Sequence, residues 1–199
     1  MQKEKALYRD WLSYPLEDPD LFAELQQISD DEDAIYDRFY RDLSFGTAGL
    51  RGIIGAGTNR MNIYTVRRAT QGLADMLRCK KKDAAVAVSY DSRIKSDLFA
   101  RAAASVLASN GIRVHIVDRL MPTPVLSFCV RHLHCDAGIM ITASHNPAAY
   151  NGYKAYGPDG CQMNAEDSKT VMQYAEKVDM FGARHQLSFE QGLEEGLIR

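Results

Sequence analysis

Apolar residues at helical spacing open the chain. They predict three short amphipathic helices near 3–12, 18–27 and 31–40, with Asp18-Pro19 and Ser29-Asp30-Asp31 forming the caps and turns between them. The acidic residues at these positions suit helix N-termini, where negative charge is favoured. We therefore expect residues 1–42 to form a helical extension that packs on a later core.

From residue 63 onward the pattern alternates between helix and strand. Helical spacing predicts helices over 63–78 and over stretches that begin near Ser96, Pro122 and Asn164, with Ser96 and Asn164 as N-caps. Short apolar runs predict strands over 84–90, 113–117, 136–142 and 151–156. The loop before the last strand is too short for a crossover helix, so that strand should be antiparallel. The expected fold is α/β, a three-layer αβα sandwich around a mixed, mainly parallel sheet with an antiparallel edge strand.

Two segments complete this prediction. The helix that starts at Pro122 is expected to bury one stripe, in which His132 would be a core histidine rather than a ligand. The stripe comprises Val125, Phe128, Cys129, His132 and Leu133. The tail over 186–199 is polar and mixed, and no element is predicted for it.

Composition narrows the possible functions. The 24 basic and 26 acidic residues nearly cancel, which removes the electrostatic argument for nucleic-acid or membrane partners. No apolar stretch approaches the roughly 20 residues of a membrane helix, and the polar N-terminus is not a secretory signal. We therefore expect a cytoplasmic protein. The four cysteines lack the spacing of a zinc or redox motif, so free thiols are expected.

Five glycines interrupt the pattern over 43–57. Glycine permits tight turns and close backbone approach, and Arg51 stands between Gly49 and Gly52. This places a cation on a backbone that can come close to a ligand, although a flexible connector would also explain the glycines.

The run Gly138-Ile139-Met140-Ile141 predicts a buried strand that ends at Thr142-Ala143-Ser144-His145-Asn146-Pro147. Ser144 lacks the G-x-S-x-G setting of a hydrolase, and His145 is expected to point away from its hydroxyl, so acyl transfer is not expected. A phosphoryl group on Ser144 would carry roughly −1.5 to −2 charges and need donors. Arg51, His145 and Lys154 are the candidates. Asp91 and Arg93, separated by one residue at a strand end, are interpreted as a charge pair that shapes the strand-to-helix turn.

Several motifs together resemble one family. Thr142 to Pro147, followed by Tyr150-Asn151-Gly152-Tyr153-Lys154, resembles the active-site loop of the α-D-phosphohexomutases, the phosphoglucomutase and phosphomannomutase superfamily. Phe45-Gly46-Thr47-Ala48-Gly49-Leu50-Arg51-Gly52 is similar to that family's phosphate-approaching loop. Tyr90-Asp91-Ser92-Arg93 and Thr123-Pro124 follow in the family's order. Asn59-Arg60-Met61-Asn62 resembles the bacterial α-phosphoglucomutase and phosphopentomutase-like branch.

The resemblance implies a mechanism. Ser144 would be the phosphoserine that exchanges phosphoryl groups with a sugar monophosphate through a sugar bisphosphate, converting hexose 1-phosphate to hexose 6-phosphate. Arg51 would hold phosphate oxygens, while Lys154 and His145 would carry protons or charge. Mg²⁺ would be bound by the Ser144 phosphate together with aspartates of a second domain.

The family's site is shared among four domains, and the chain has the length of the first. We therefore expect residues 1–199 to be domain I, with domains II to IV missing, weak magnesium binding and little activity alone. Phosphoglucomutase is the preferred activity, but the resemblance leaves open glucose, mannose, glucosamine and pentose phosphates. A sugar-1,6-bisphosphate synthase, or a non-catalytic binding or structural module with this fold, is the alternative.

Overall fold

The computed structural model describes residues 2–44, 46 and 49–199. The expected loop residues Phe45, Thr47 and Ala48 therefore lie outside the described part of the chain. In chain order the elements are α1 (Gln2–Ser13), α2 (Pro19–Gln27), α3 (Glu32–Phe39), β1 (Leu50–Ile53), α4 (Ile63–Lys80), β2 (Ala85–Tyr90), α5 (Ser96–Ser109), β3 (Arg113–Ile116), α6 (Thr123–His132), β4 (Ala137–Ile141), β5 (Tyr150–Tyr156), α7 (Ala165–Ala175) and α8 (Phe189–Glu194).

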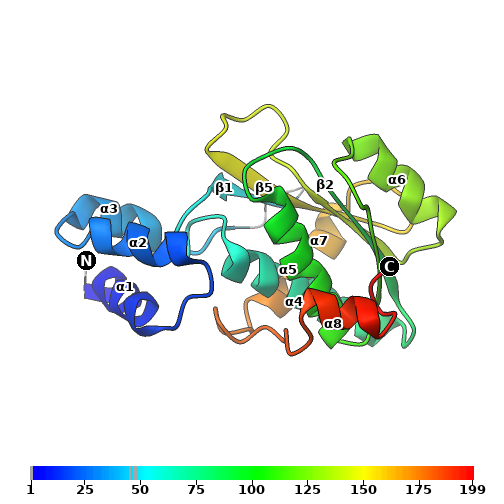
Figure 1. Cartoon of the computed structure of the whole chain (residues 1–199), viewed down its shortest axis with the longest axis horizontal. Helices are drawn as coiled ribbons and strands as arrows, with labels where there is room; N and C mark the ends of the chain where they lie inside the picture. The colour runs from blue at the N-terminus through cyan, green and yellow to red at the C-terminus, as the bar shows by residue number, and fades with distance from the viewer. Residues whose placement is uncertain (1, 45, 47–48) are drawn as a thin grey trace.

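The strands form a five-stranded sheet in the order β1-β5-β4-β2-β3 (Figure 1). β2 pairs in parallel with β3 and β4, whereas β5 is antiparallel to both β4 and β1. The predicted mixed sheet with antiparallel pairing at one edge is confirmed, and β1 covers the outer side of β5. Because β2 and β4 are parallel neighbours, their carboxyl ends lie side by side at the same end of the sheet's strands.

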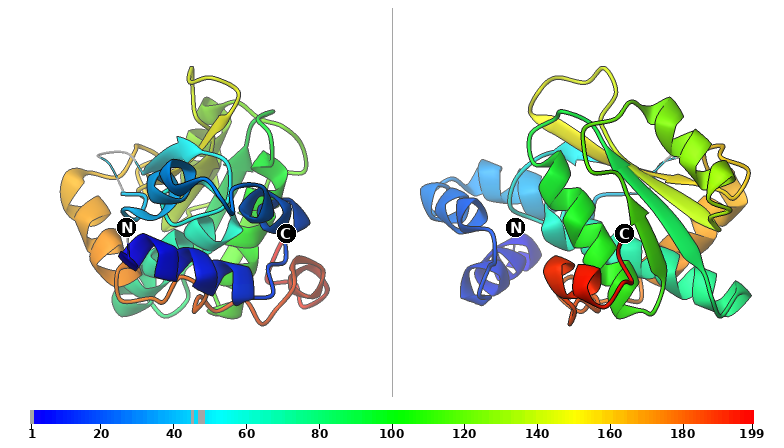
Figure 2. Two further views of the ribbon diagram at one scale, coloured as in Figure 1. Left: turned by 90° about the vertical axis from the view of Figure 1, so that its left-hand side faces the viewer. Right: turned by 45° about the vertical axis from the view of Figure 1, so that its right-hand side comes forward.

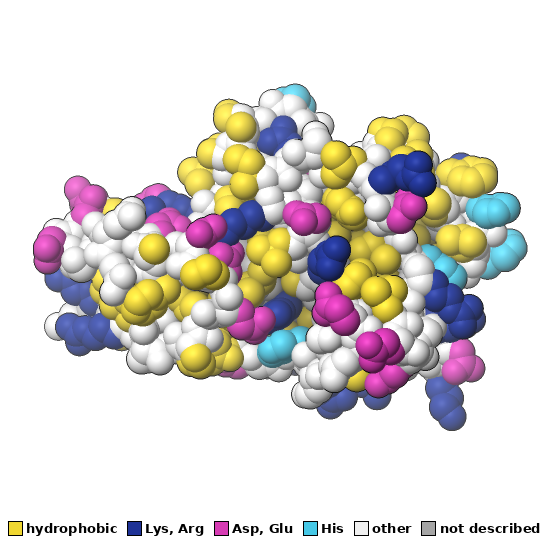
Figure 3. All heavy atoms as spheres, in the orientation of Figure 1, with side chains coloured by type: hydrophobic (Ala, Val, Ile, Leu, Met, Phe, Trp, Pro, Cys, Tyr) yellow, Lys and Arg dark blue, Asp and Glu magenta, His cyan; other side chains and the backbone are white. Residues whose placement is uncertain are grey.

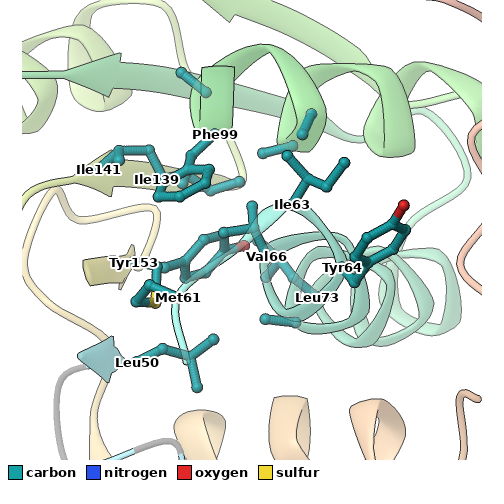
Figure 4. Packing of buried hydrophobic residues seen from close by; sticks show 14 of the residues in the cluster. Leu50, Met61, Ile63, Tyr64, Val66, Leu73, Phe99, Ile139, Ile141 and Tyr153 are labelled. Atoms are coloured by element: carbon teal, nitrogen blue, oxygen red, sulfur yellow. The ribbon is translucent and has the colours of Figure 1, made fainter. Parts of the chain in front are cut away.

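Helices cover both faces of the sheet (Figure 2). On one face α4 and α5 enclose the main core, in which Tyr153, Ile139 and Phe99 are fully buried (Figure 4). On the other face α6 packs on β2 and β4 through Leu126 and Val130. Alternate strand residues supply the two cores, as the side-chain period of a strand requires.

The N-terminal helices pack on this sandwich through aromatic side chains. Trp11 of α1 is 1% exposed, and its ring centroid lies 5.9 Å from that of Phe39, 5.5 Å from Tyr64 and 5.3 Å from Phe181. These partners lie in α3, in α4 and in the segment after α7. One side chain therefore joins α1 to three other parts of the fold.

Two local predictions are wrong. In α6 the buried positions are Leu126 and Val130, while Phe128 is 56% exposed and stacks on His132 with ring centroids 5.1 Å apart. Both sets have helical spacing, so periodicity alone did not distinguish the inner face from the outer one. His132 is therefore not a core histidine.

Ser96 does not cap α5. The N-cap is Lys95, with φ of 60°, and Ser96 is the first helical residue. Its hydroxyl donates to Asp91 Oδ1 and accepts from Asn151 Nδ2, so it is not free to bond the helix's own amides. The predicted Asn164 cap of α7 is confirmed. The tail contains an unpredicted helix, α8, and Ile198 then bridges to Val114 of β3.

Candidate active site

Ser144 lies just beyond the carboxyl end of β4, in a segment that we call the serine loop, residues 142–149. It is exposed, and its φ of 58° is left-handed, which costs a residue other than glycine roughly 1–2 kcal/mol. Its amide donates to Thr142 Oγ1 at 3.0 Å, and the Asn146 amide donates to the Ala143 carbonyl at 3.1 Å. A strained backbone is thus held in place at the residue predicted to react.

The Asp91-Ser92-Arg93 turn follows β2 and lies against this loop. A cavity of about 420 Å³ is lined by Asp91, Arg93, Ser144 and Asn146, among others. The ion pair expected between Asp91 and Arg93 is long, with 3.9 Å between Oδ2 and Nε. The terminal nitrogens of Arg93 instead donate to backbone carbonyls of the serine loop. The sequence interpretation thus identified the turn and missed its main contact.

The side chains of Arg51 and Lys154 project from the same face of the sheet. Arg51 of β1 is opposite Gly152 of β5, and Lys154 lies two residues further along β5. Arg51 Nη1 donates to Asn146 Oδ1 at 2.8 Å, which ties β1 to the serine loop. The close approach of the strands depends on Gly49, where an added Cβ would lie 1.9 Å from the Tyr153 carbonyl oxygen. The fold therefore brings Arg51 and Lys154 to the part of the sheet that carries Ser144 and its neighbour His145.

Burial, together with the Arg51 guanidinium, lowers the pKa of the Lys154 amine, and the Asp91 carboxylate partly offsets this. A lowered pKa means that more of the amine is neutral, and able to accept a proton, at a given pH. We expect Arg51→Gln to raise the Lys154 pKa, since one cause of the shift is removed. NMR titration of lysines labelled with ¹³C at Cε would measure it. Arg119→Gln, a change at an exposed arginine, should leave the value as it was; an unchanged Lys154 pKa in Arg51→Gln would contradict the interpretation.

His145, the fourth predicted residue, does not point away from the serine. Its Nδ1 lies 3.5 Å from Ser144 Oγ, at the limit of a hydrogen bond, so the expectation from sequence is wrong. Figure 3 shows histidine and basic side chains together on the protrusion that this loop forms. The imidazole is therefore close enough to bond a group attached to Ser144.

The described residues of this chain do not fit a magnesium ion by themselves. Within them, no three His, Cys, Asp or Glu side chains are grouped as a metal site would require. Asp91, a carboxylate that lines the same cavity as Ser144, already accepts from the Arg93 amide and the Ser96 hydroxyl through Oδ1. One serine oxygen and one engaged carboxylate are too few oxygen ligands for this ion.

A larger groove, of about 510 Å³, lies away from the serine loop between α5 and the C-terminal tail. Figure 3 shows it as a hollow with acidic, basic and histidine side chains around it. Arg67 bonds to Glu17 at its edge, and His185 Nε2 lies 3.5 Å from the same carboxylate. Its charged groups thus already pair with one another, whereas the smaller cavity contains the exposed serine and is the better candidate for chemistry.

Comparison with known proteins identifies the family of the chain. The family described as phosphoglucomutase/phosphomannomutase, alpha/beta/alpha domain I, matches residues 42–181. The chain belongs to this family. The resemblance of residues 43–156 to this family is therefore confirmed, and the serine loop lies within the matched residues of this phosphoglucomutase/phosphomannomutase domain. Within the described residues, no helix is long and apolar enough to cross a membrane.

Relatives in this family are substantially longer. A phosphoglucomutase from Staphylococcus haemolyticus is 47% identical over 136 residues, which cover 68% of this chain and 25% of that protein. One from Staphylococcus saprophyticus is 48% identical over 137 residues, covering 69% and 25%. The chain thus spans about a quarter of the length of these relatives.

Solved structures agree with the fold. A crystal structure of a Thermus thermophilus protein matches with a TM-score of 0.65 and 33% identity, over 78% of this chain and 35% of that one. Parafusin of Paramecium matches with a TM-score of 0.60 at 23% identity, over 70% and 26% of the two chains, which supports the fold alone.

Proposed function

We propose that this chain is the N-terminal, phosphoserine-bearing domain of a phosphosugar mutase whose other domains complete the site. Among such mutases, we favour a phosphoglucomutase. The observation that carries the proposal is the exposed Ser144 hydroxyl on a hydrogen-bonded loop at the carboxyl ends of the parallel strands, with Arg51 bonded to the same loop. Ligands often bind at such edges. Membership of the family gives this serine a precedent as a phosphoryl carrier.

In the proposed reaction the phosphoryl group of phosphorylated Ser144 passes to a hydroxyl of a hexose monophosphate. The bond between phosphorus and Ser144 Oγ breaks, a bond to the sugar oxygen forms, and the hydroxyl proton leaves to a base. The resulting bisphosphate then returns its other phosphoryl group to Ser144, so the net change is migration of phosphate between C1 and C6. Stabilisation of oxygen charge and positioning supply most of the catalysis in such transfers.

The side chains around Ser144 suit these steps. Arg51 can exchange its bond to Asn146 for phosphate oxygens, which it binds as a planar fork. Lys154 has a lowered pKa and can accept the hydroxyl proton, and His145 is an alternative for the same task. Magnesium would be held chiefly by side chains outside this chain, so we expect the chain alone to bind it weakly and to turn over little substrate.

Phosphoryl labelling tests the proposal. The chain joined to its remaining domains is incubated with a hexose 1,6-bisphosphate, and the peptides are analysed by mass spectrometry. We expect a phosphoryl group on the peptide that contains Ser144, and none on that peptide in Ser144→Ala. A label at another residue, or no label while the sugar phosphate still turns over, would exclude the phosphoserine mechanism.

The same preparation separates the alternatives. A sugar-1,6-bisphosphate synthase would accumulate bisphosphate from a second phosphoryl donor, whereas a mutase would return monophosphate. A binding or structural module would leave every phosphosugar unchanged even with Ser144 intact.

A further inference from the structure

We propose that Arg93 is a positioning residue, which holds the reactive serine by binding the backbone of its loop rather than by contacting the sugar phosphate. The proposal rests on the proposed function only in taking Ser144 as the group to be positioned. Its geometric part concerns the serine loop itself and stands whether or not the loop reacts.

Four carbonyl oxygens converge on the Arg93 side chain. Nη2 donates to the carbonyls of Ser144 and Asn146, both at 2.7 Å. Nη1 donates to those of Pro147 at 3.0 Å and Tyr150 at 3.1 Å. The two terminal nitrogens of a guanidinium carry four hydrogens, so each hydrogen has one carbonyl as its acceptor.

These bonds fix the conformation of the reactive residue. A carbonyl held by a donor defines the plane of its peptide group, and the Ser144 carbonyl is one of the four. Arg93 therefore restrains the backbone that directs the Ser144 side chain. Because φ at Ser144 is 58°, the loop needs outside contacts to stay in this conformation. The Arg93 side chain is 14% exposed, so water has little access to replace its hydrogen bonds.

Hydrogen bonds from neighbouring residues fix the turn that carries Arg93. Asp91 Oδ1 accepts from the Arg93 amide at 3.1 Å and from the Ser96 hydroxyl at 3.1 Å. Asn151, fully buried in β5, donates to the Ile94 carbonyl and to Ser96 Oγ, both at 3.0 Å. The turn that carries Arg93 is thus attached to the start of α5 and to β5.

A simple charge pair between Arg93 and Asp91 is the competing explanation. It predicts that the carboxylate charge of Asp91 contributes most to holding the Arg93 side chain. The contact between these two groups measures 3.9 Å, however, while the four carbonyl contacts of Arg93 measure 2.7 to 3.1 Å. Charge-assisted bonds of the shorter kind are much the stronger. Lysine has one nitrogen and three hydrogens, so Arg93→Lys cannot satisfy all four carbonyls.

Hydrogen exchange of the 199-residue chain tests the geometric part. The amides of Ser144, Asn146 and Tyr150 are hydrogen-bonded to acceptors in the serine loop and report on its opening. We expect exchange of these amides to be at least about tenfold faster in Arg93→Ala, with an intermediate effect in Arg93→Lys.

Two control variants accompany this measurement. Arg119→Ala removes an arginine that is 71% exposed and pairs with its neighbour Asp118, and Asp91→Asn removes the charge of the competing pair. We expect near-normal exchange of the loop amides in both. Unchanged exchange in Arg93→Ala, or an equal increase in Asp91→Asn, would overturn the proposal. Thermal unfolding checks that each variant is folded, and Arg93→Lys serves if the alanine variant is not.

Kinetics of the chain joined to its remaining domains test the second part. A misplaced nucleophile lowers the rate of transfer more than substrate binding, so we expect kcat to fall roughly 100-fold in Arg93→Ala with KM changed less than about threefold. Added methylguanidinium should restore part of the loss. A rise in KM alone would mean that Arg93 binds the substrate instead. If loop exchange is faster in Arg93→Ala but Ser144→Ala keeps full activity, the proposed function is rejected and the restraint of the loop by Arg93 still stands.

Discussion

Ser144→Ala is expected to reduce turnover of a hexose phosphate by at least about a thousandfold in the proposed multidomain mutase, because the variant lacks the oxygen that would carry the phosphoryl group. The Thr142 hydroxyl, two residues before Ser144, accepts a hydrogen bond from the Ser144 amide at 3.0 Å. Coupled assay of glucose 6-phosphate formation would measure the effect.

Ser13→Ala is the matched control for this experiment. Ser13 lies at the end of α1, where its hydroxyl donates to the Asp10 carbonyl, and it has no contact with the serine loop. We expect normal kcat and KM. Ser144→Thr adds a sharper comparison, since it keeps the hydroxyl but places a β-branched residue at a φ of 58°. Its activity should fall well below that of the wild type. Turnover near the normal rate in Ser144→Ala would reject the phosphoserine mechanism.

Trp11→Ala is expected to lower the free energy of unfolding by about 3–5 kcal/mol, since it empties a buried site between α1, α3 and α4. For a chain of this length the melting temperature should fall by roughly 6–20 °C. Trp11 is the single tryptophan, so unfolding is followed by circular dichroism rather than by fluorescence. The large effect would mean that the N-terminal helices are part of one cooperative unit with the sandwich.

Phe22→Ala provides the control in the same group of helices. Phe22 of α2 is 40% exposed, and removing a half-exposed ring should change the free energy of unfolding by about 1 kcal/mol or less. An equally small change in Trp11→Ala would show that α1 is only loosely attached and that its aromatic contacts contribute little.

Prediction from sequence succeeded where local pattern and fold agree. The strands from residue 85 onward and the sandwich helices other than α6 have periodicities that match their burial, so α4, β2, β4 and β5 lie close to their expected ranges. Ser144, Arg51 and Lys154 remain predictions from motif and charge, and the register of β1 on β5 brings Arg51 and Lys154 to one face. The α6 stripe failed because two faces of that helix carry apolar residues at the same spacing.

Local pattern and motif were enough to predict the family, the alternation of helices and strands, and the residue types available for the proposed phosphoryl transfer, because short stretches of sequence carry each of these signals. The proposed role of Arg93, in contrast, depends on the folded chain. Its partners lie more than fifty residues away along the chain, and they are backbone carbonyls, which every residue has and which no sequence motif marks. They converge because parallel β2 and β4 end at the same edge of the sheet.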